Sequence, residues 1–178
     1  MYSIKLGSSV KLTARCILVL GAIASTACTG AGTSSPLTAD QSVATTNSVR
    51  AFAATVADDV TRRGPVAWRA HFANTPAFFM AAEGRLVFAN NDDATRGIQQ
   101  LAGSIAHVEL RWGDPMRVDP LTPTLAMLGM PYHEVRVDTA GHRAEETGYF
   151  TGLAELGPAG WRFRNAHWSV PGAPSSVP

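Results

Sequence analysis

The sequence predicts an α+β domain in which three helices cover one face of a curved antiparallel sheet. Apolar residues recur at helical spacing between about residues 40 and 103, with one short hairpin pattern among them. From about residue 106 the spacing changes to two, which is typical of half-buried strands. With 178 residues, of which 46% are hydrophobic, the chain is large enough for one domain with its own core.

The charged residues are unevenly distributed. Lys5, Lys11 and Arg15 all lie in the first fifteen residues. From residue 28 onward the chain has 12 arginines, no lysine and 14 acidic residues, which gives a net charge of −2. Because this balance includes no basic cluster, we expect no nucleic-acid partner.

Residues 1–27 have the composition of a secretory signal peptide. A basic segment ends at Arg15, an apolar run follows from Cys16 to Ala24, and small residues precede Cys28. The apolar run is much shorter than the roughly 20 residues that a membrane-spanning helix needs, so a transmembrane anchor is the weaker alternative.

Cys28 is predicted to carry a lipid. The segment Ser25-Thr26-Ala27-Cys28 resembles a bacterial lipobox, although Ser25 stands where leucine is commonest. The alternative is an ordinary signal-peptidase site beside an ordinary cysteine. Cys16 and Cys28 are the only cysteines, so the exported domain would contain no disulfide. We therefore expect an exported, membrane-anchored bacterial lipoprotein, on the periplasmic or cell-surface side, with residues 28–39 forming the lipidated cysteine and a flexible tether.

The first predicted helix covers residues 40–63. Thr38 and Gln41 have the spacing of a capping box, and Gly64-Pro65 ends the pattern. The apolar residues that define its buried side are Val49, Phe52, Ala53, Val56 and Val60.

Two further helices and a hairpin follow. Pro65 suits the first position of a short helix that carries Trp68, His71 and Phe72 on one side. The segment Ala77–Ala89 reads as two short strands around Glu83-Gly84. A third helix begins at Asn90-Asn91 and ends near Gly103.

The remaining chain is predicted as a four-strand meander. The first strand is Ala106–Trp112, and Gly113-Asp114-Pro115 interrupts it as a bulge or bend. A long strand follows from about Leu125 to Asp138, with Pro131 suggesting an edge or another bulge. Turns at residues 138–141 and 157–160 lead to Glu145–Leu156 and to the last strand. In the long strand we expect one face to carry Met127, His133, Val135 and Val137.

The order of these elements resembles the nuclear transport factor 2-like, or SnoaL-like, superfamily over about residues 40–170. The resemblance rests on AW-x-x-HF (residues 67–72), F-x-M-x-x-x-G (residues 78–84) and above all the terminal GWRFRNAHWS (residues 160–169). It implies a cone-shaped, cystatin-like half-barrel with a pocket between sheet and helices, and a homodimer joined through the sheets. Residues 171–178 are then a flexible tail.

The superfamily includes ketosteroid isomerases, polyketide cyclases, dehydratases, epoxide hydrolases and non-catalytic binding modules, so fold does not decide function. Its isomerase-like members place a carboxylate base near the first hairpin, with a tyrosine or an acid as oxyanion donor. Only Glu83 lies in a comparable place, at a turn tip, and the first helix contains no tyrosine. We therefore do not expect this chain to have the carboxylate base and oxyanion donor of the isomerase-like members.

Other catalytic and metal chemistry has little support in the sequence. The five histidines form no metal-binding motif, and His142 beside its turn is expected to be exposed. Glu145 and Glu146 are neighbours on a strand and should point to opposite faces, paired with Arg136 or Arg143. No G-x-S-x-G elbow accompanies Ser169. We expect no catalytic residue, no metal and no cofactor.

The final strand supplies the last expectations. Because Arg162 and Arg164 suit the solvent or dimer side, His167 should face the helices, as a structural hydrogen-bonding residue or as a ligand contact. Trp112 and Trp168 are expected on the outer face, in a dimer interface. The candidates for the pocket lining are Trp68, His71, Phe72, Phe163, Asn165 and His167.

The leading functional hypothesis is a surface-anchored lipoprotein domain whose apolar pocket binds a small hydrophobic molecule or a partner protein. The alternative is a cofactor-independent SnoaL-like enzyme of the isomerase, cyclase or dehydratase type. A third is a purely structural role through the sheet dimer. An enzyme would need a base with a perturbed pKa near a hydrogen-bond donor, whereas a binding module would have few converging polar groups.

Overall fold

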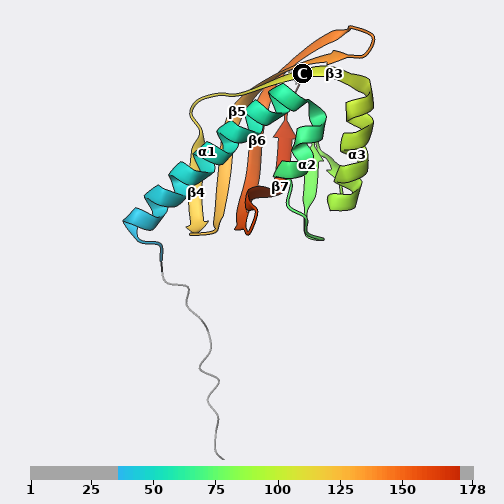
Figure 1. Ribbon diagram of the computed structural model, residues 1–178. Helices are drawn as coiled ribbons and strands as arrows, with labels where there is room; N and C mark the ends of the chain where they lie inside the picture. The colour runs from blue at the N-terminus through green and yellow to red at the C-terminus, as the bar shows by residue number, and fades with distance from the viewer. Residues whose placement is uncertain (1–35, 173–178) are drawn as a thin grey trace, which may run out of the picture. The chain divides into compact units, whose positions relative to one another are not determined.

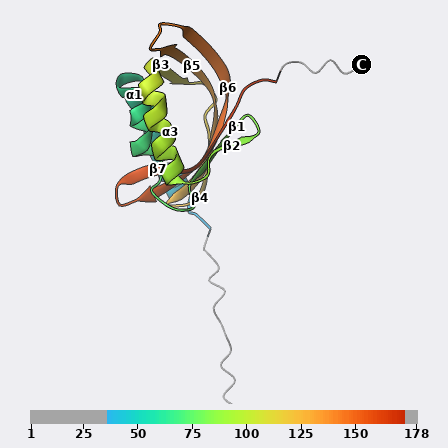
Figure 2. The same cartoon turned by 90° about the vertical axis from the view of Figure 1, so that its right-hand side faces the viewer.

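A computed structural model describes residues 36–172 of the chain, and within them three α-helices pack on one face of a seven-stranded curved sheet (Figures 1 and 2). The predicted signal peptide, Cys28 and most of the predicted tether lie outside the described residues, as do residues 173–178 of the predicted tail. The α+β fold class is confirmed.

The first helix, α1 (Ala39–Arg63), forms as its sequence predicts. The Thr38 hydroxyl accepts a hydrogen bond from the Gln41 backbone N–H at 3.2 Å, and the Gln41 side chain accepts one from the Thr38 N–H at 3.0 Å, so the predicted capping box is present. The five predicted apolar positions, from Val49 to Val60, are all buried against the sheet. Gly64 ends the helix.

The short elements that follow also lie where the sequence places them. Pro65–Ala67 is a 3₁₀ turn (η1), and α2 (Trp68–His71) continues from it. Strands β1 (Phe79–Ala82) and β2 (Arg85–Phe88) form a hairpin whose two turn residues, Glu83 and Gly84, have φ of 54° and 74°. Helix α3 (Asn91–Ser104) is capped by the Asn90 side chain, which accepts a hydrogen bond from the Asp93 N–H at 2.9 Å.

The sheet has the strand order β2-β1-β7-β6-β5-β3, and β4 also pairs with β5. Its remaining strands are β3 (Ile105–Trp112), β4 (Arg117–Thr122), β5 (Leu125–Asp138), β6 (Arg143–Gly157) and β7 (Gly160–Ser169). All pairs are antiparallel except β1 with β7, which is parallel, so the sheet is mixed. The expectation of a wholly antiparallel sheet is wrong at this pair, because the early hairpin joins the edge of the last strand, a pairing that no local turn dictates.

The predicted bend after Trp112 is confirmed. Strand β3 pairs with the second half of β5, from Tyr132 to Asp138, and β4 pairs with its first half, from Leu125 to Gly129. Between them the Gly113 N–H donates to the Pro131 carbonyl at 2.8 Å. Strands β3 and β4 therefore pair one after the other with the same side of β5, and the chain bends at Gly113 between them.

The face of β5 that was expected to carry Met127 is the one turned away from the helices. The helix-facing side chains in the first half of β5 are the even-numbered ones, whereas Met127 is 47% exposed on the other side. Because this part of the strand carries apolar residues on both faces, alternation alone cannot choose between them, and the position of α1 decides. The residues buried on the helix side are Ala126, Leu128, Met130 and Tyr132.

The expected face of the end of β7 is wrong. Phe163 pairs with Ala154 and Asn165 pairs with Leu153, so Arg164 is an extra residue in a β-bulge. After the bulge the alternation is shifted by one residue, which turns Ala166 and Trp168 toward the helices and His167 away from them. The expectation that His167 and Asn165 share the face of Phe163 is corrected by this single residue.

Trp112 and Trp168 lie on the helix-covered side and not on the outer face. Their rings are stacked with centroids 5.7 Å apart, and the Trp112 Nε1–H donates to the Ala53 carbonyl of α1 at 2.7 Å. Together with Phe150, Phe163 and Phe78, which are fully buried, they belong to or pack against a single apolar core between helices and sheet.

Candidate functional site

A cavity of about 260 Å³ lies between the helices and the sheet, next to the β1–β2 hairpin. Helices α2 and α3 and strands β1, β2, β5, β6 and β7 all contribute to its lining. The apolar lining residues are Trp68, Phe72, Met80, Ala82, Val87, Phe88, Ile98, Leu101 and Trp168. The charged lining residues are Glu83, Glu134, Arg136 and Glu146.

Aromatic rings build the floor of the cavity. The Trp168 indole has its centroid 5.7 Å from that of Trp68, in an edge-to-face arrangement, and 4.7 Å from those of Tyr132 and Phe150. Trp68 in turn stacks on Phe72 at 5.4 Å. Because these rings pack on one another, the wall presents a broad apolar surface.

The polar end of the cavity is one connected group of side chains. The Tyr132 hydroxyl donates to Glu146 Oε1 at 2.6 Å, and Arg136 Nη2 donates to Glu146 Oε2 at 3.1 Å. Arg136 Nε lies 3.1 Å from Glu134 Oε1. Arg136 therefore links two carboxylates that come from neighbouring strands, β5 and β6.

Gly148 makes room for this arrangement. A Cβ at this position would lie 2.1 Å from the Ser169 carbonyl oxygen and within 2.9 Å of two ring carbons of Tyr132. Only glycine lets the Tyr132 ring lie across β6, where its hydroxyl reaches Glu146 two residues along the strand.

The electrostatic environment shifts two of these groups. Burial raises the pKa of Glu134 above its usual value of 4.5, the Arg136 guanidinium opposes the shift, and the Glu146 carboxylate adds to it. Burial and the hydrogen bond to Glu146 raise the pKa of the Tyr132 phenol. Tyr132 is therefore a protonated donor across the physiological range, and Glu134 is the lining carboxyl whose pKa is raised.

The six predicted pocket residues separate into three pairs. Trp68 and Phe72 line the cavity, and His71 and Phe163 are buried in the core outside the cavity lining. Asn165 and His167 lie in a groove of about 550 Å³ on the opposite face of the sheet. The structure thus brings two of the six to the cavity.

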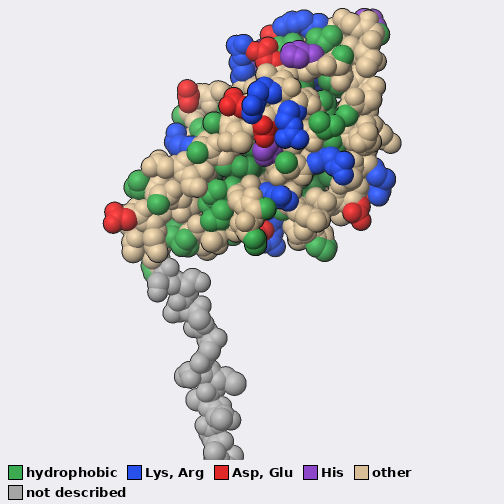
Figure 3. Space-filling model, viewed as in Figure 1, with side chains coloured by type: hydrophobic (Ala, Val, Ile, Leu, Met, Phe, Trp, Pro, Cys, Tyr) green, Lys and Arg blue, Asp and Glu red, His purple; other side chains and the backbone are tan. Residues whose placement is uncertain are grey.

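His71 has a structural environment. Its Nε2 lies 3.1 Å from Asp59 Oδ2, and its ring packs beside Phe52 with centroids 6.0 Å apart. Burial lowers its pKa, against the opposing effect of Asp59, so the imidazole is mainly neutral near neutral pH. Figure 3 shows basic and acidic side chains side by side over the helix-covered face, where Asp59 also pairs with Arg62 at 2.9 Å.

None of the charged residues at the end of the cavity is among the six predicted pocket residues, although the pairing of Glu146 with Arg136 was expected. Alternation carries the buried series Ala126, Leu128, Met130 and Tyr132 onward to Glu134 and Arg136, on the same face of β5. The sequence therefore contained a signal for this charged site: two charged residues that continue an inward-facing series of apolar residues. The predicted opposite orientation of Glu145 and Glu146 is confirmed, since Glu146 lines the cavity and Glu145 pairs with Arg143 and His133 at 2.6 Å each.

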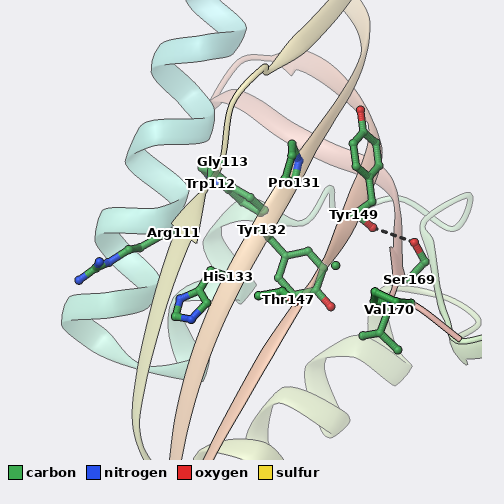
Figure 4. Close-up of a pocket in the computed structure, with 12 residues that line it drawn as sticks. Arg111, Trp112, Gly113, Pro131, Tyr132, His133, Thr147, Tyr149, Ser169 and Val170 are labelled. Carbon is green, nitrogen blue, oxygen red and sulfur yellow. Dashed lines mark hydrogen bonds between the residues drawn. The ribbon is translucent and has the colours of Figure 1, made fainter. Parts of the chain in front are cut away.

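Larger hollows lie elsewhere on the described residues, and two of them, of about 660 and 550 Å³, are open grooves. The larger groove runs along the sheet where β6 extends beyond β7 (Figure 4). Figure 4 shows Tyr149 and Ser169 joined there by the hydrogen bond from the Ser169 hydroxyl to the Tyr149 carbonyl, 3.1 Å long, with Arg111 and His133 on the far side. Neither this groove nor the 550 Å³ one gathers a group of linked charges like that of the cavity.

No group of three or more histidine, cysteine or acidic side chains in residues 36–172 is arranged to hold a metal ion. No helix in that part of the chain is long and apolar enough to cross a membrane.

Comparison with known proteins identifies the fold. No protein-family model matches the chain, and no curated protein matches it in sequence. Among solved structures, a nuclear transport factor 2-like superfamily protein from Salmonella enterica superposes with a TM-score of 0.64 at 13% identity, covering 76% of this chain and 96% of its own. A proposed scytalone dehydratase from Novosphingobium aromaticivorans gives 0.65 at 9% identity, with 76% and 89% covered.

A third similar structure is a proposed dehydratase of the same fold from Streptomyces avermitilis, with a TM-score of 0.59 at 13% identity and coverage of 74% and 99%. The three likenesses agree with the arrangement of helices on a curved, unclosed mixed sheet. At these identities they establish the fold alone, and the chemistry has to be argued from this chain's own residues.

Proposed function

Given a nuclear transport factor 2-like fold, we propose that this domain binds a small, largely apolar molecule in the cavity between its helices and its sheet. The observation that carries the proposal is the lining itself: an aromatic and aliphatic wall with one group of converging charged side chains at its end. At about 260 Å³ the cavity is below the usual range for drug-sized ligands, which favours a molecule of one or two rings.

A two-ring fluorescent probe of apolar sites, 6-propionyl-2-(dimethylamino)naphthalene, tests this proposal with the full-length chain. We expect Ala82→Phe to weaken probe binding at least tenfold, because Ala82 lines the cavity and a phenyl ring would occupy it. Ala81→Phe is the matched control, since Ala81 is paired with His167 on the outward face and its replacement leaves the cavity open. Equal binding by both variants would contradict the proposal.

The alternative is an enzyme that acts without a cofactor, and one observation favours it. Glu134 is a carboxyl group with a raised pKa in a cavity that also holds the Tyr132–Glu146 pair, which is the kind of environment that suits a proton-transferring acid or base. Two of the similar structures are proposed dehydratases.

Molecules from a native extract distinguish the two candidates. We expect mass spectrometry of compounds retained by the wild-type chain, and not by Ala82→Phe, to recover them unchanged. Conversion of a retained compound to a product lighter by one water, lost in Glu134→Gln, would instead support the dehydratase type.

We also propose that the domain is exported and held at a membrane surface by a lipid on Cys28. The support is the sequence pattern of residues 1–28. Intact mass and detergent partitioning of the mature protein should show an acylated chain that starts at Cys28, and Cys28→Ser should move to the aqueous phase. Cys16→Ser is the control and should keep the lipid. A water-soluble product with another N-terminus would contradict the proposal.

A further inference from the structure

The charged end of the cavity carries more negative than positive charge. Glu134 and Glu146 share one guanidinium, that of Arg136, at 3.1 Å from each. Glu83 lines the cavity as well, and its Oε1 accepts a hydrogen bond from the Val170 N–H at 3.1 Å. Tyr132 supplies a neutral donor and no charge. Three carboxylates therefore face one positive charge.

One of these carboxylates, that of Glu134, lies in a poorly solvated place, whereas Glu146 and Arg136 are 37% and 38% exposed and Glu83 is exposed. The Glu134 side chain is only 14% exposed, and the apolar lining separates it from much of the solvent. Within the described residues, no hydrogen bond reaches the second carboxylate oxygen of Glu134, which keeps some contact with solvent and can accept a hydrogen bond from a ligand, whereas both Glu146 oxygens have partners. An unbalanced charge is costly in such surroundings, so an occupant that brings a positive charge is favoured over a neutral or anionic one.

The apolar wall suits the same kind of occupant. The ring systems of Trp68 and Trp168 lie in the same cavity as the carboxylates. Indole faces attract cations as well as apolar groups, and an ammonium group offers up to three donors to carboxylate oxygens. The raised pKa of Glu134 is consistent with this view, because a proton partly balances the charge when no other cation is present.

We propose that the molecule bound in this cavity is a small organic cation, with an aromatic or alicyclic body against Trp68 and Trp168 and a protonated amine beside Glu134 and Glu146. The proposal rests on the proposed function, since it names the class of ligand for the same cavity. It excludes carboxylates and phosphates as ligands with the acid group at this end.

Three probes of the same shape test the charge preference. Binding of 2-(2-naphthyl)ethylamine, 2-(2-naphthyl)ethanol and 3-(2-naphthyl)propionate to the full-length chain is measured by calorimetry at pH 7. We expect the ammonium to bind at least tenfold more tightly than the alcohol and the propionate to bind most weakly.

Glutamine variants test the residues. Glu134→Gln and Glu146→Gln should each reduce the preference for the ammonium over the alcohol at least threefold. Glu145→Gln, the adjacent carboxylate on the opposite face, is the matched control and should keep the full preference. Thermal unfolding of each variant shows whether it remains folded, and Glu134→Gln leaves the Tyr132–Glu146 hydrogen bond in place.

The outcomes separate the two proposals. If none of the three probes binds wild type, or all bind Ala82→Phe equally well, the cavity is not a binding site and the proposed function fails. If the alcohol binds as tightly as the ammonium, the cavity is a binding site but the organic cation is excluded. A preference that survives in both Glu134→Gln and Glu146→Gln would overturn the assignment to these carboxylates.

Discussion

The inner and outer faces of the sheet are made by the same strands but are covered differently. On the inner face, Phe150, Phe163 and Ala166 are at most 2% exposed beneath the helices. On the outer face, Phe79, Leu121 and Met127 are between 45% and 50% exposed, around an open groove. Both faces carry apolar residues, so composition alone does not distinguish them.

Strand β7 shows what determines which side chains face the helices and which lie on the outer face. Before the bulge at Arg164 its odd-numbered residue Phe163 faces the helices, and after it the even-numbered Ala166 and Trp168 do. A residue's role therefore depends on the register of the strand at that point, and one extra residue reverses the assignment of every side chain beyond it.

The largest expected effect comes from the inner face. Phe163→Ala removes a fully buried ring that packs on Phe52 and Phe150 with centroids 4.9 and 5.0 Å away. We expect a loss of about 3–5 kcal/mol in the free energy of unfolding, measured by urea denaturation. Asn165→Ala, two residues along on the outer face, is the control and should cost at most about 0.5 kcal/mol. Similar losses in the two variants would remove the distinction between the faces.

The second prediction concerns association of two copies of the chain through the outer face of the sheet. We propose that its exposed apolar side chains form a homodimer interface, in place of the two tryptophans expected from the sequence. Met127→Asp should weaken dimerisation by about 2 kcal/mol or more, because it places a charge in an apolar contact, while the unfolding of the monomer changes little. Analytical ultracentrifugation of wild type and variant measures this. A wild-type chain that stays monomeric at micromolar concentration would refute the dimer.

A smaller effect is expected at the charged end of the inner face. The folded-state pKa of Glu134 is raised, so its favourable contribution is complete below its ordinary pKa and is lost as the pH rises through the folded-state value. Wild type should therefore lose stability over this window, and Glu134→Gln should show a flatter profile in urea denaturation. Glu145→Gln is the control: the pKa of Glu145 is lowered, mainly by its hydrogen bond to His133, so its effect belongs to acid pH. If the free energy of unfolding of wild type and of Glu134→Gln changed with pH in the same way, the pH dependence would not come from Glu134.

The smallest effect is expected for His167. Because this side chain is exposed on the outer face, His167→Gln should change the unfolding free energy by no more than about 0.5 kcal/mol and leave probe binding in the cavity unchanged. His71→Gln provides the contrast, since it disturbs a buried imidazole and its hydrogen bond to Asp59, and should cost about 1–2 kcal/mol. A His167 variant that loses cavity binding would contradict the observed orientation of β7.

Local signals were sufficient for most of the elements. The capping box at Thr38, the stop at Gly64-Pro65, the Glu83-Gly84 turn and the cap at Asn90 each depend on residues within a few positions of one another, and each is present in the structure. The long strand Leu125–Asp138 was also predicted with its observed ends. These features follow from backbone preferences that act over short distances.

The candidate site was predicted only in part, because its residues come from seven elements. Trp68 and Phe72 could be found from the helical pattern, but Glu134, Arg136 and Glu146 enter the site through the register of β5 with β6. The inward direction of Glu134 and Arg136 was visible only as a continuation of the even-numbered series of β5, and the sequence alone does not say which face of that strand the helices cover.

The sequence by itself determined the α+β class, the order of the helices and strands, the approximate ends of most of them, and the buried stripe of α1, since each of these depends on periodicity and on local turn and cap chemistry. Only the tertiary structure decided which face of β5 and β7 is covered, that β1 joins β7 in parallel, and that Arg136 lies between two glutamates. These depend on pairing between residues far apart in the chain, where a shift of one residue changes the face but leaves the local pattern intact.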